Sequence, residues 1–575
     1  LIFRWGKKMS NYVSQFIESF SVLKISSQDA VSNGNSELSD DKNYFHVERP
    51  IEIDLIERLE KIKQLSKPQV LFLCGNVGDG KSHLLSYIKT NRPDLLENTD
   101  IHNDATESFS PEETALDTLY NVLGKFKDDV DERANSKKHL IIAINMGVLH
   151  KFIYDEKIRK DYRDICNFVH ESDLFNENKA VSGYHNQNKH IISLLDNQLY
   201  TIKNGKLKSV FFEELLLKIT QKSSNNSIRN AWEKDREMGI NNIEHKNFQI
   251  LMDESIRSNI MNSILEAIFK EKIILSVRSF LNFIHEIVIP DSLEIEENKC
   301  LPQLLFNQLG KSELLDALYT LDPAKKRRRE YDEVLSNFIV DTNYTNMIQT
   351  YIENEEMINC YWKDEEKIQK NVASLLGFLI RSVYLSKKEQ EPTYFTDFIK
   401  TLFGSLTGNE QIAEKFIELL KKVKLELYGE GFKQFVFDYR QNTNYVIGFD
   451  ISHFTVTGIE QFNAYPNKIE LNKFNTSIKV VYEYEKSDDN YVIEIDYPLY
   501  EFLCKVKMGY RPNRKVQAEM TKFTGFIDKL MDNYPNDKNV YILNRETRYL
   551  MEINEKKSLF SATNNIPKLT AKESQ

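Results

Sequence analysis

The sequence predicts an α/β fold on a parallel sheet, followed by a helical lid or bundle and a β-rich C-terminal domain. Short apolar runs alternate with amphipathic segments early in the chain, helical periodicity dominates from about 255 to 425, and the apolar period changes to two beyond about residue 429. The expected domains are an N-terminal arm or linker over 1–45, an α/β domain over 46–290, a helical domain over 291–428 and the β-rich domain over 429–575.

The α/β domain is predicted from its alternating segments. The expected strands are the apolar runs 70–74, 139–145 and 191–195, with a shorter strand near Ile101. The expected helices cover 51–65 and 82–88, and a third begins at Ser110, where Ser-Pro-Glu-Glu is typical of a capping box. Asn-rich polar stretches at 176–190 and 223–230 are expected to be loops. The order of strands and helices is that of a parallel sheet with helical crossovers.

Alternating residues predict a hairpin in the C-terminal domain. Its strands run over 478–484 and 491–497, and polar residues 486–490 form the turn. A helix is expected near 516–532. In the preceding helical domain, the segment 411–427 has the apolar face of an amphipathic helix. The domain after residue 429 is therefore expected to be β-rich with one helix.

Composition excludes several classes of protein. The 575 residues are 41% hydrophobic and 28% charged, which excludes a disordered or fibrous chain. The net charge of -10, from 76 Lys+Arg and 86 Asp+Glu, argues against a generally basic nucleic-acid-coating protein. The five cysteines are dispersed, so neither a disulfide framework nor a zinc site is expected. We expect no membrane-spanning helix and no secretion signal, and hence a cytoplasmic protein.

One motif specifies chemistry. The residues Gly75, Asn76, Val77, Gly78, Asp79, Gly80, Lys81 and Ser82 fit the pattern G-x-x-x-x-G-K-[ST]. They follow an apolar strand and open a helix, so backbone N–H groups would surround phosphate oxygens at a helix N-terminus. Lys81 would reach the β- and γ-phosphates, and Ser82 would bind Mg²⁺. The sequence therefore predicts a P-loop NTPase, of the AAA-like type, with ATP and Mg²⁺ as cofactors.

Hydrolysis also requires an acidic group near Mg²⁺ and a residue that orients water. The strand 140–145 lies where an additional-strand NTPase would place its acidic residues, but it ends in Asn145. Asp104 and Glu107 are therefore the candidates for metal support and water activation, with a surface turn as the alternative. Arg278, which opens a later helix, is the candidate contact to the γ-phosphate, with an ordinary exposed or ion-paired arginine as the alternative.

A resemblance to a known family is carried by four segments: FLCGNVGDGKSHLL (72–85), DIHNDATESFSPEETALDTL (100–119), LIIAINMGVLHKF (140–152) and ILSVRSFLNFIHEIV (274–288). Together they resemble the DptF family of DNA phosphorothioation-dependent restriction proteins. The resemblance covers most of the NTPase region and does not extend to the C-terminal domain. It implies a cytoplasmic bacterial defence protein that acts with DptG-like and DptH-like partners to restrict DNA lacking phosphorothioate linkages.

Two basic clusters are candidate DNA contacts. The first is Lys325, Lys326, Arg327, Arg328 and Arg329, placed near an expected helix start, where positive charge opposes the helix dipole. The second is Arg511, Arg514 and Lys515, which follow Tyr510. An ordinary solvated surface is the alternative for both clusters. No nuclease motif is recognised, so we expect a partner to cut DNA.

Three functions remain open from the sequence. The first is an ATP-hydrolysing subunit of a restriction complex, with weak turnover by the isolated chain. The second is a nucleotide-binding scaffold that does not hydrolyse, which the amide at Asn145 favours. The third is a signalling ATPase that does not act on DNA.

Overall fold

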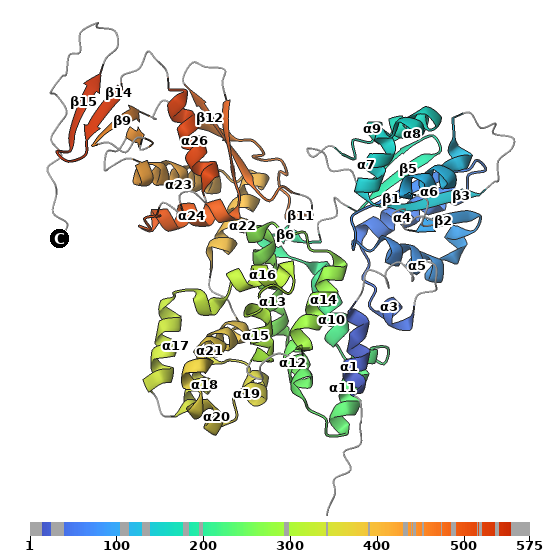
Figure 1. Ribbon diagram of the computed structural model, residues 1–575, viewed down its shortest axis with the longest axis horizontal. Helices are drawn as coiled ribbons and strands as arrows, with labels where there is room; N and C mark the ends of the chain where they lie inside the picture. The colour runs from blue at the N-terminus through green and yellow to red at the C-terminus, as the bar shows by residue number, and fades with distance from the viewer. Residues whose placement is uncertain are drawn as a thin grey trace, which may run out of the picture. The chain divides into compact units, whose positions relative to one another are not determined.

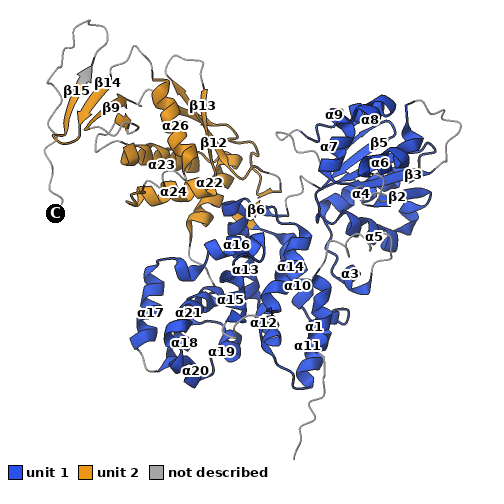
Figure 2. Cartoon of the chain, in the orientation of Figure 1, with its two compact units in different colours: residues 1–201, 208–390 blue, residues 202–207, 391–575 orange. Residues whose placement is uncertain are grey.

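A computed structural model describes most of the chain. The described residues are 14–24, 39–103, 114–128, 138–175, 183–194, 199–291, 298–340, 343–388, 392–428, 435–438, 440, 444–450, 454–472, 474–484, 490–513, 516, 520–534 and 540–553. The chain divides into two compact units (Figure 2), residues 1–201 with 208–390 and residues 202–207 with 391–575. The first unit contains the predicted phosphate-binding loop.

A five-stranded sheet organises the first part of this unit (Figure 1). Its strands are β1 (Val70–Cys74), β2 (Thr99–Asn103), β3 (His139–Ile144), β4 (Gly183–Asn186) and β5 (Lys189–Ser193). They lie in the order β2-β3-β1-β5-β4, in which β4 is antiparallel to β5 and the other pairs are parallel. The parallel sheet predicted from the alternation of strands and helices is confirmed for β2, β3, β1 and β5, whereas the antiparallel edge strand β4 was not predicted.

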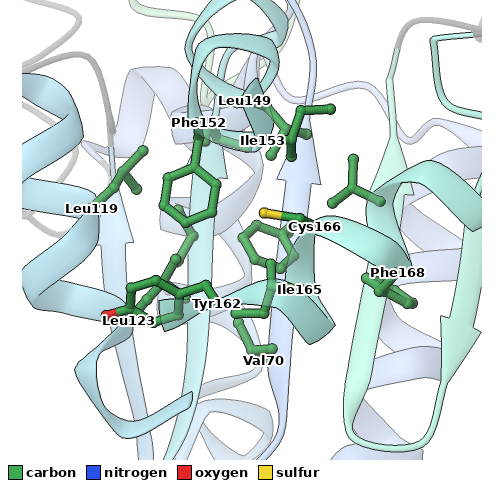
Figure 3. Packing of buried hydrophobic residues seen from close by; sticks show 14 of the residues in the cluster. Val70, Leu119, Leu123, Leu149, Phe152, Ile153, Tyr162, Ile165, Cys166 and Phe168 are labelled. Carbon is green, nitrogen blue, oxygen red and sulfur yellow. The ribbon is translucent and has the colours of Figure 1, made fainter. Parts of the chain in front are cut away.

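Helices cover both faces of this sheet, which explains why β1 and β3 are buried along their whole length. One face carries α6 (Ala115–Val122), η4 (Leu123–Phe126), α7 (Met146–Tyr154), α8 (Glu156–Asp161) and α9 (Arg163–Glu171). Phe152 and Ile165 from these helices, and Tyr162 between α8 and α9, pack there with Val70 (Figure 3). Phe72 belongs to the same cluster. The other face carries α4 (Pro50–Lys63), α5 (Lys81–Asn91) and η3 (Pro93–Leu96). Alternate residues of β1 thus belong to two different cores.

Two details differ from the sequence expectations, and a third falls outside the described residues. The stretch 176–190, expected to be a loop, contains β4, a short polar edge strand without an apolar pattern. The second expected loop, 223–230, contains the start of α11, where the Asn226 side chain accepts a hydrogen bond from the Arg229 N–H. The first described residue of α6 is Ala115, capped by Thr114, whereas Ser110 lies outside the described residues.

Part of the expected N-terminal arm is folded onto the first unit. Residues 14–24 form α1 (Gln15–Phe20) and η1 (Ser21–Leu23), and α3 (Asp40–Tyr44) precedes α4. Phe16 and Phe20 are fully buried and pack on the ring of Phe248. The buried Asp235 carboxylate accepts hydrogen bonds from the Ser14 hydroxyl and the Phe16 N–H, which fixes the start of α1.

The rest of the first unit is helical. It comprises α10 (Val210–Thr220), α11 (Ser227–Glu237), α12 (Ile243–Leu251), α13 (Glu254–Glu271), α14 (Val277–Val288), α15 (Leu301–Phe306), α16 (Glu313–Thr320), η7 (Pro323–Lys325), α17 (Arg329–Val340), α18 (Tyr344–Tyr351), α19 (Glu355–Tyr361), α20 (Glu365–Lys370) and α21 (Val372–Ser386). Its interior holds an ion pair in which Arg381 Nε and Nη2 donate to the Asp322 carboxylate at 3.0 and 2.6 Å. In the part of the chain that the structure describes, no helix is long and apolar enough to cross a bilayer.

The second unit is β-rich and also contains helices. It contains β6 (Thr201–Lys203), β7 (Lys206–Lys208), β8 (Phe435–Asp438), β9 (Tyr445–Asp450), β10 (Phe454–Ile459), β11 (Glu470–Leu471), β12 (Ile478–Tyr484), β13 (Asn490–Ile495), β14 (Val540–Asn544), β15 (Tyr549–Ile553), α22 (Tyr394–Thr407), α23 (Glu410–Tyr428), α24 (Tyr497–Lys507) and α26 (Thr521–Asp532). Its sheets have the orders β11-β6-β7, β10-β12-β13 and β15-β14-β9-β8. The predicted hairpin is confirmed as β12 and β13.

Two boundaries in the second unit differ from those expected. Helices α22 and α23, which the sequence analysis placed in the helical domain, belong to this unit. Tyr497, expected in a strand, begins α24 instead. The Asp496 side chain accepts a hydrogen bond from the Leu499 N–H, and Pro498 occupies the first turn, which together favour a helix start.

Candidate functional site

The predicted phosphate-binding loop connects β1 to α5. Gly78 and Gly80 have φ angles of +89° and +87°, in the region that favours glycine. A Cβ added at Gly78 would lie 2.8 Å from Ser276 Oγ, and one added at Gly80 would lie 3.2 Å from Arg49 Nη2. Both positions therefore require glycine for their backbone conformation, and both are closely approached by other side chains.

The sheet places this loop at its carboxyl edge. Strands β3 and β5 flank β1, and Cys74 at the end of β1 is level with Ile144 and Ser193 at the ends of its neighbours. The chain passes from β1 to β2 and β3 on one side and then to β5 on the other. The loop consequently lies where the strand order reverses, which is the usual ligand position in open α/β sheets.

Lys81 folds back over the loop. Its Nζ donates hydrogen bonds to the carbonyl oxygens of Gly75 and Asn76 at 3.0 and 2.8 Å. Lys81 and Ser82 lie in the first turn of α5, where the first helical hydrogen bond runs from the Leu84 N–H to the Gly80 carbonyl. Backbone amides that precede this bond belong to the helix end that attracts anions. The loop thus combines a flexible cation with a helix N-terminus.

A carboxylate also lies within the loop. Asp79 Oδ2 accepts a hydrogen bond from the Asn76 N–H at 2.6 Å, and it would be 3.1 Å from a Cβ at Gly75. Burial raises the pKa of the Asp79 carboxyl, whereas the Asn76 amide and the positive charges of Lys81 and Arg49 act to lower it. An anionic ligand in this loop would meet the charge of Asp79 as well as that of Lys81.

Arg49, which the sequence analysis did not select, contacts the loop from the start of α4. Its side chain is 7% exposed, its Nη1 donates to the Asp79 carbonyl oxygen at 2.8 Å, and its guanidinium carbon is 5.7 Å from the ring centroid of Phe211. Burial lowers the pKa of Arg49, and the charges of Glu52 and Asp79 oppose this effect. The available sequence signal was an arginine just before Pro50 at a helix start, where the helix dipole disfavours positive charge.

A histidine pair links α5 to the segment before α4. Nε2 of His83 is 3.1 Å from Nδ1 of His46, and Nε2 of His46 is 3.0 Å from Oε2 of Glu52. Burial lowers the pKa of His83 to about 3, with the charges of His46 and Arg49 acting in the same direction. His83 is therefore neutral near pH 7 and adds no positive charge beside Ser82.

Arg278 lies beside the loop, near the place that the sequence analysis gave it. It is the second residue of α14, which Ser276 and Ser279 begin with a capping box. The Cβ of Arg278 would be 3.5 Å from a Cβ at Gly78. The structure thus brings Arg278 to the loop, while its contact with a γ-phosphate stays a prediction.

Asn145 directly follows β3 and caps α7. Its Oδ1 accepts a hydrogen bond from the Val148 N–H at 3.0 Å. The sequence analysis treated its strand as the one that would carry the acidic residues, yet β3 pairs directly with β1, and β2 lies one strand further away. Asp104 comes next in the chain after β2. Both Asp104 and Glu107 lie outside the described residues.

Part of the first basic cluster is already paired. Lys325 Nζ is 2.8 Å from the ring centroid of Tyr319 and 4.0 Å from the Asp322 carboxylate. Lys326 lies 3.8 Å from the Glu266 carboxylate, and Arg328 lies 3.8 Å from that of Glu330. Arg327 and Arg329 are exposed. These two arginines are therefore the members of the run best placed to meet an outside anion.

The second basic cluster is described only in part. Arg511 Nη2 is 2.9 Å from the Glu426 carboxylate, whereas Arg514 and Lys515 lie outside the described residues.

Comparison of the sequence with protein-family models finds no matching family, and comparison with curated proteins finds no match either. The case for a function therefore rests on the loop and on sequence patterns.

Proposed function

We propose that this chain binds ATP with Mg²⁺ at the loop between β1 and α5, as a P-loop NTPase of the AAA-like type. The observation that carries the proposal is the position of Lys81. It lies in the first turn of the helix that follows a glycine loop at the carboxyl edge of a parallel sheet, with its ammonium group held by two carbonyl oxygens of the loop. Gly78 and Gly80 give the loop a conformation that other residues would strain.

Each loop residue has a definite task in this proposal. Lys81 exchanges its two carbonyl partners for phosphate oxygens, which are stronger acceptors because they are charged. The Ser82 hydroxyl provides a ligand for Mg²⁺, and the bound ion neutralises charge on the phosphates. Arg278, beside Gly78, supplies a positive charge near the outer phosphate.

The sheet order supports a place for the catalytic carboxylate. In additional-strand NTPases one strand separates the P-loop strand from the acidic one, and here β3 separates β1 from β2. We assign Asp104, just after β2, to Mg²⁺ and Glu107 to the attacking water. Asn145, at the end of the intervening strand, is then a residue that orients water through its amide.

The biological setting is proposed from the sequence alone. The four segments that resemble the DptF family support a role as the ATPase subunit of a bacterial phosphorothioation-dependent DNA restriction complex. Its partners would be DptG-like and DptH-like proteins, in the cytoplasm, and Arg327 and Arg329 would be candidate DNA contacts.

Phosphate release tests this function. Wild type, Lys81→Ala and Lys89→Ala are assayed with Mg²⁺, alone, with DNA and with the partner proteins. Lys89 is an exposed lysine on the same helix and serves as the matched control. The proposal predicts release that is lost in Lys81→Ala and retained in Lys89→Ala. Equal release by all three proteins would assign the activity to a contaminant and reject the site.

A scaffold that does not hydrolyse is the second candidate, because Asn145 provides an amide whose oxygen already caps α7. It predicts saturable ATP binding without phosphate release under every condition, including with DNA and partners. Any release above background that requires Lys81 excludes it.

A further inference from the structure

The phosphate-binding loop contains a negative charge that its function does not require. Asp79 accepts the Asn76 N–H at 2.6 Å, and its carboxylate also approaches Gly75, so it lies within the loop rather than pointing away from it. A carboxylate at this position repels the phosphates of a bound nucleotide. A nucleotide site with such a residue needs a second positive charge that stays in place.

We infer that Arg49 is a positioning residue for this loop, and that its charge offsets Asp79 when nucleotide binds. The inference rests on the proposed function of the loop as a nucleotide site. Lys81 cannot fill this role alone, because its ammonium group must leave the loop carbonyls and turn to the phosphates. Arg49 contacts the Asp79 backbone rather than the loop interior, so it stays in place.

Two contacts hold Arg49. Its Nη1 donates to the Asp79 carbonyl oxygen at 2.8 Å, and its guanidinium carbon lies 5.7 Å from the centroid of the Phe211 ring. Its Nη2 also lies close to Gly80, where an added Cβ would be 3.2 Å away. The side chain is more than nine-tenths buried. A planar guanidinium can donate on one edge and pack its face on an aromatic ring, whereas a lysine can satisfy only one of these demands well.

The geometry of Arg49 also explains why the loop needs glycine at position 80. A Cβ there would lie 3.2 Å from Arg49 Nη2, so the guanidinium would have to shift by a few tenths of an ångström, in addition to the strain of the positive φ angle. Arg49 therefore fixes the two residues that lead directly into α5. Its loss should loosen Asp79 and Gly80 even in the absence of nucleotide.

A double-mutant cycle tests the inference. The variants are Arg49→Gln, Asp79→Asn and the double variant, with Arg159→Gln as a matched control for loss of an exposed arginine on α8. The first readout is amide hydrogen exchange of residues 76–82 in the nucleotide-free protein. The second is the dissociation constant for ATP with Mg²⁺. Asp79→Asn keeps an oxygen to accept the Asn76 N–H while it removes the charge.

We expect Arg49→Gln to speed exchange in the loop and to weaken ATP binding about tenfold, since contacting residues couple on this scale. Asp79→Asn should bind ATP more tightly than wild type. In the double variant the loss caused by Arg49→Gln should be much smaller, because no carboxylate is left uncompensated. Arg49→Lys, which keeps the charge, should retain most of the affinity but not the slow exchange.

Two results would overturn the inference: unchanged loop exchange in Arg49→Gln, or additive effects on ATP affinity in the cycle. If wild type binds no ATP, the proposed function fails. The exchange readout then still decides whether Arg49 positions the loop, and the charge-offset part is rejected along with the nucleotide site. Arg49→Lys serves as the exchange probe if the Gln variant does not fold.

Discussion

The ammonium group of Lys81 donates a hydrogen bond to the carbonyl oxygen of Gly75 at 3.0 Å, across the loop that separates β1 from α5. This contact closes the loop on itself. Because Ser276 and Arg278 approach it at Gly78, and Arg49 approaches it at Gly80, helices on two sides of the loop set its shape. The predictions below follow from these contacts and from the buried groups elsewhere in the chain.

Gly78→Ala should destabilise the protein and weaken nucleotide binding. The substitution forces an L residue to a φ of +89° and brings a methyl group to within 2.8 Å of Ser276 Oγ. The free energy of unfolding should fall by about 1–3 kcal/mol in urea titrations. Gly124→Ala is the control, because a Cβ there meets no atom within 4 Å. Equal effects of the two substitutions would contradict the conformation assigned to the loop.

Asp322→Ala should be among the most destabilising substitutions in the helical part. It leaves the buried guanidinium of Arg381 without its carboxylate, which costs about 3–5 kcal/mol in comparable buried pairs. Glu366→Ala, which breaks the exposed pair with Lys370, should cause a much smaller change. The measurement is again the free energy of unfolding, and a small loss for Asp322→Ala would show that this pair is dispensable.

Stability should fall as the pH drops below about 6.5. Burial lowers the pKa of His190 and of His285 to about 4, so each is neutral in the folded protein and gains a proton on unfolding between about pH 4 and 6.5. The unfolded state then binds more protons, and acid favours it. Urea midpoints measured from pH 7 to 4.5 should fall less steeply for His190→Gln than for wild type. Parallel curves would show that His190 makes no such contribution.

DNA binding, where it occurs, should be weak, independent of sequence and strongly dependent on salt, because only local clusters of cations are available on an acidic chain. Reversal of charge at Arg327 and Arg329 should flatten the plot of log affinity against log salt concentration. Lys325→Gln is the control, since Tyr319 and Asp322 already engage that ammonium group. An unchanged slope in the variant with both charges reversed would show that the first basic cluster is an ordinary solvated surface.

Turnover by the isolated chain should be slow and should rise when partners or DNA are added. If the carboxylates come from Asp104 and Glu107 rather than from the end of β3, their placement can depend on assembly, and an arginine from a partner could add about 10³-fold or more. Asp104→Ala and Glu107→Gln should each abolish the stimulated rate. Fast release by wild type alone, or full stimulation in both variants, would show that the catalytic carboxylate is elsewhere.

The elements that the sequence predicted well are those with a strong apolar pattern. β1 matches its expected range because a five-residue apolar run leaves few alternatives, and the β12–β13 hairpin follows from strict alternation. β4 was missed because an exposed edge strand is held by backbone hydrogen bonds and needs no apolar side chains. The start of α11 was missed because Asn and Ser favour both loops and helix caps.

The candidate site was predictable only in part for a related reason. The loop motif is local in sequence, so Lys81 and Ser82 could be selected from spacing alone. Arg49 meets the loop through tertiary packing across 30 residues, and no periodic pattern records that contact. The role of β3 also depends on the order of strands in the sheet, which cannot be read from the sequence. Because β3 lies between β1 and β2, Asn145 follows the intervening strand.

Calorimetric titration of ATP with Mg²⁺ into wild type and Lys81→Ala tests the central claim most directly. The account predicts saturable binding to wild type at one site per chain and no detectable binding to Lys81→Ala, with the thermal stability of the variant unchanged because Lys81 lies outside the hydrophobic cores. Equal affinity of the two proteins for ATP, or no binding to wild type at all, would contradict the assignment of this loop as a nucleotide site.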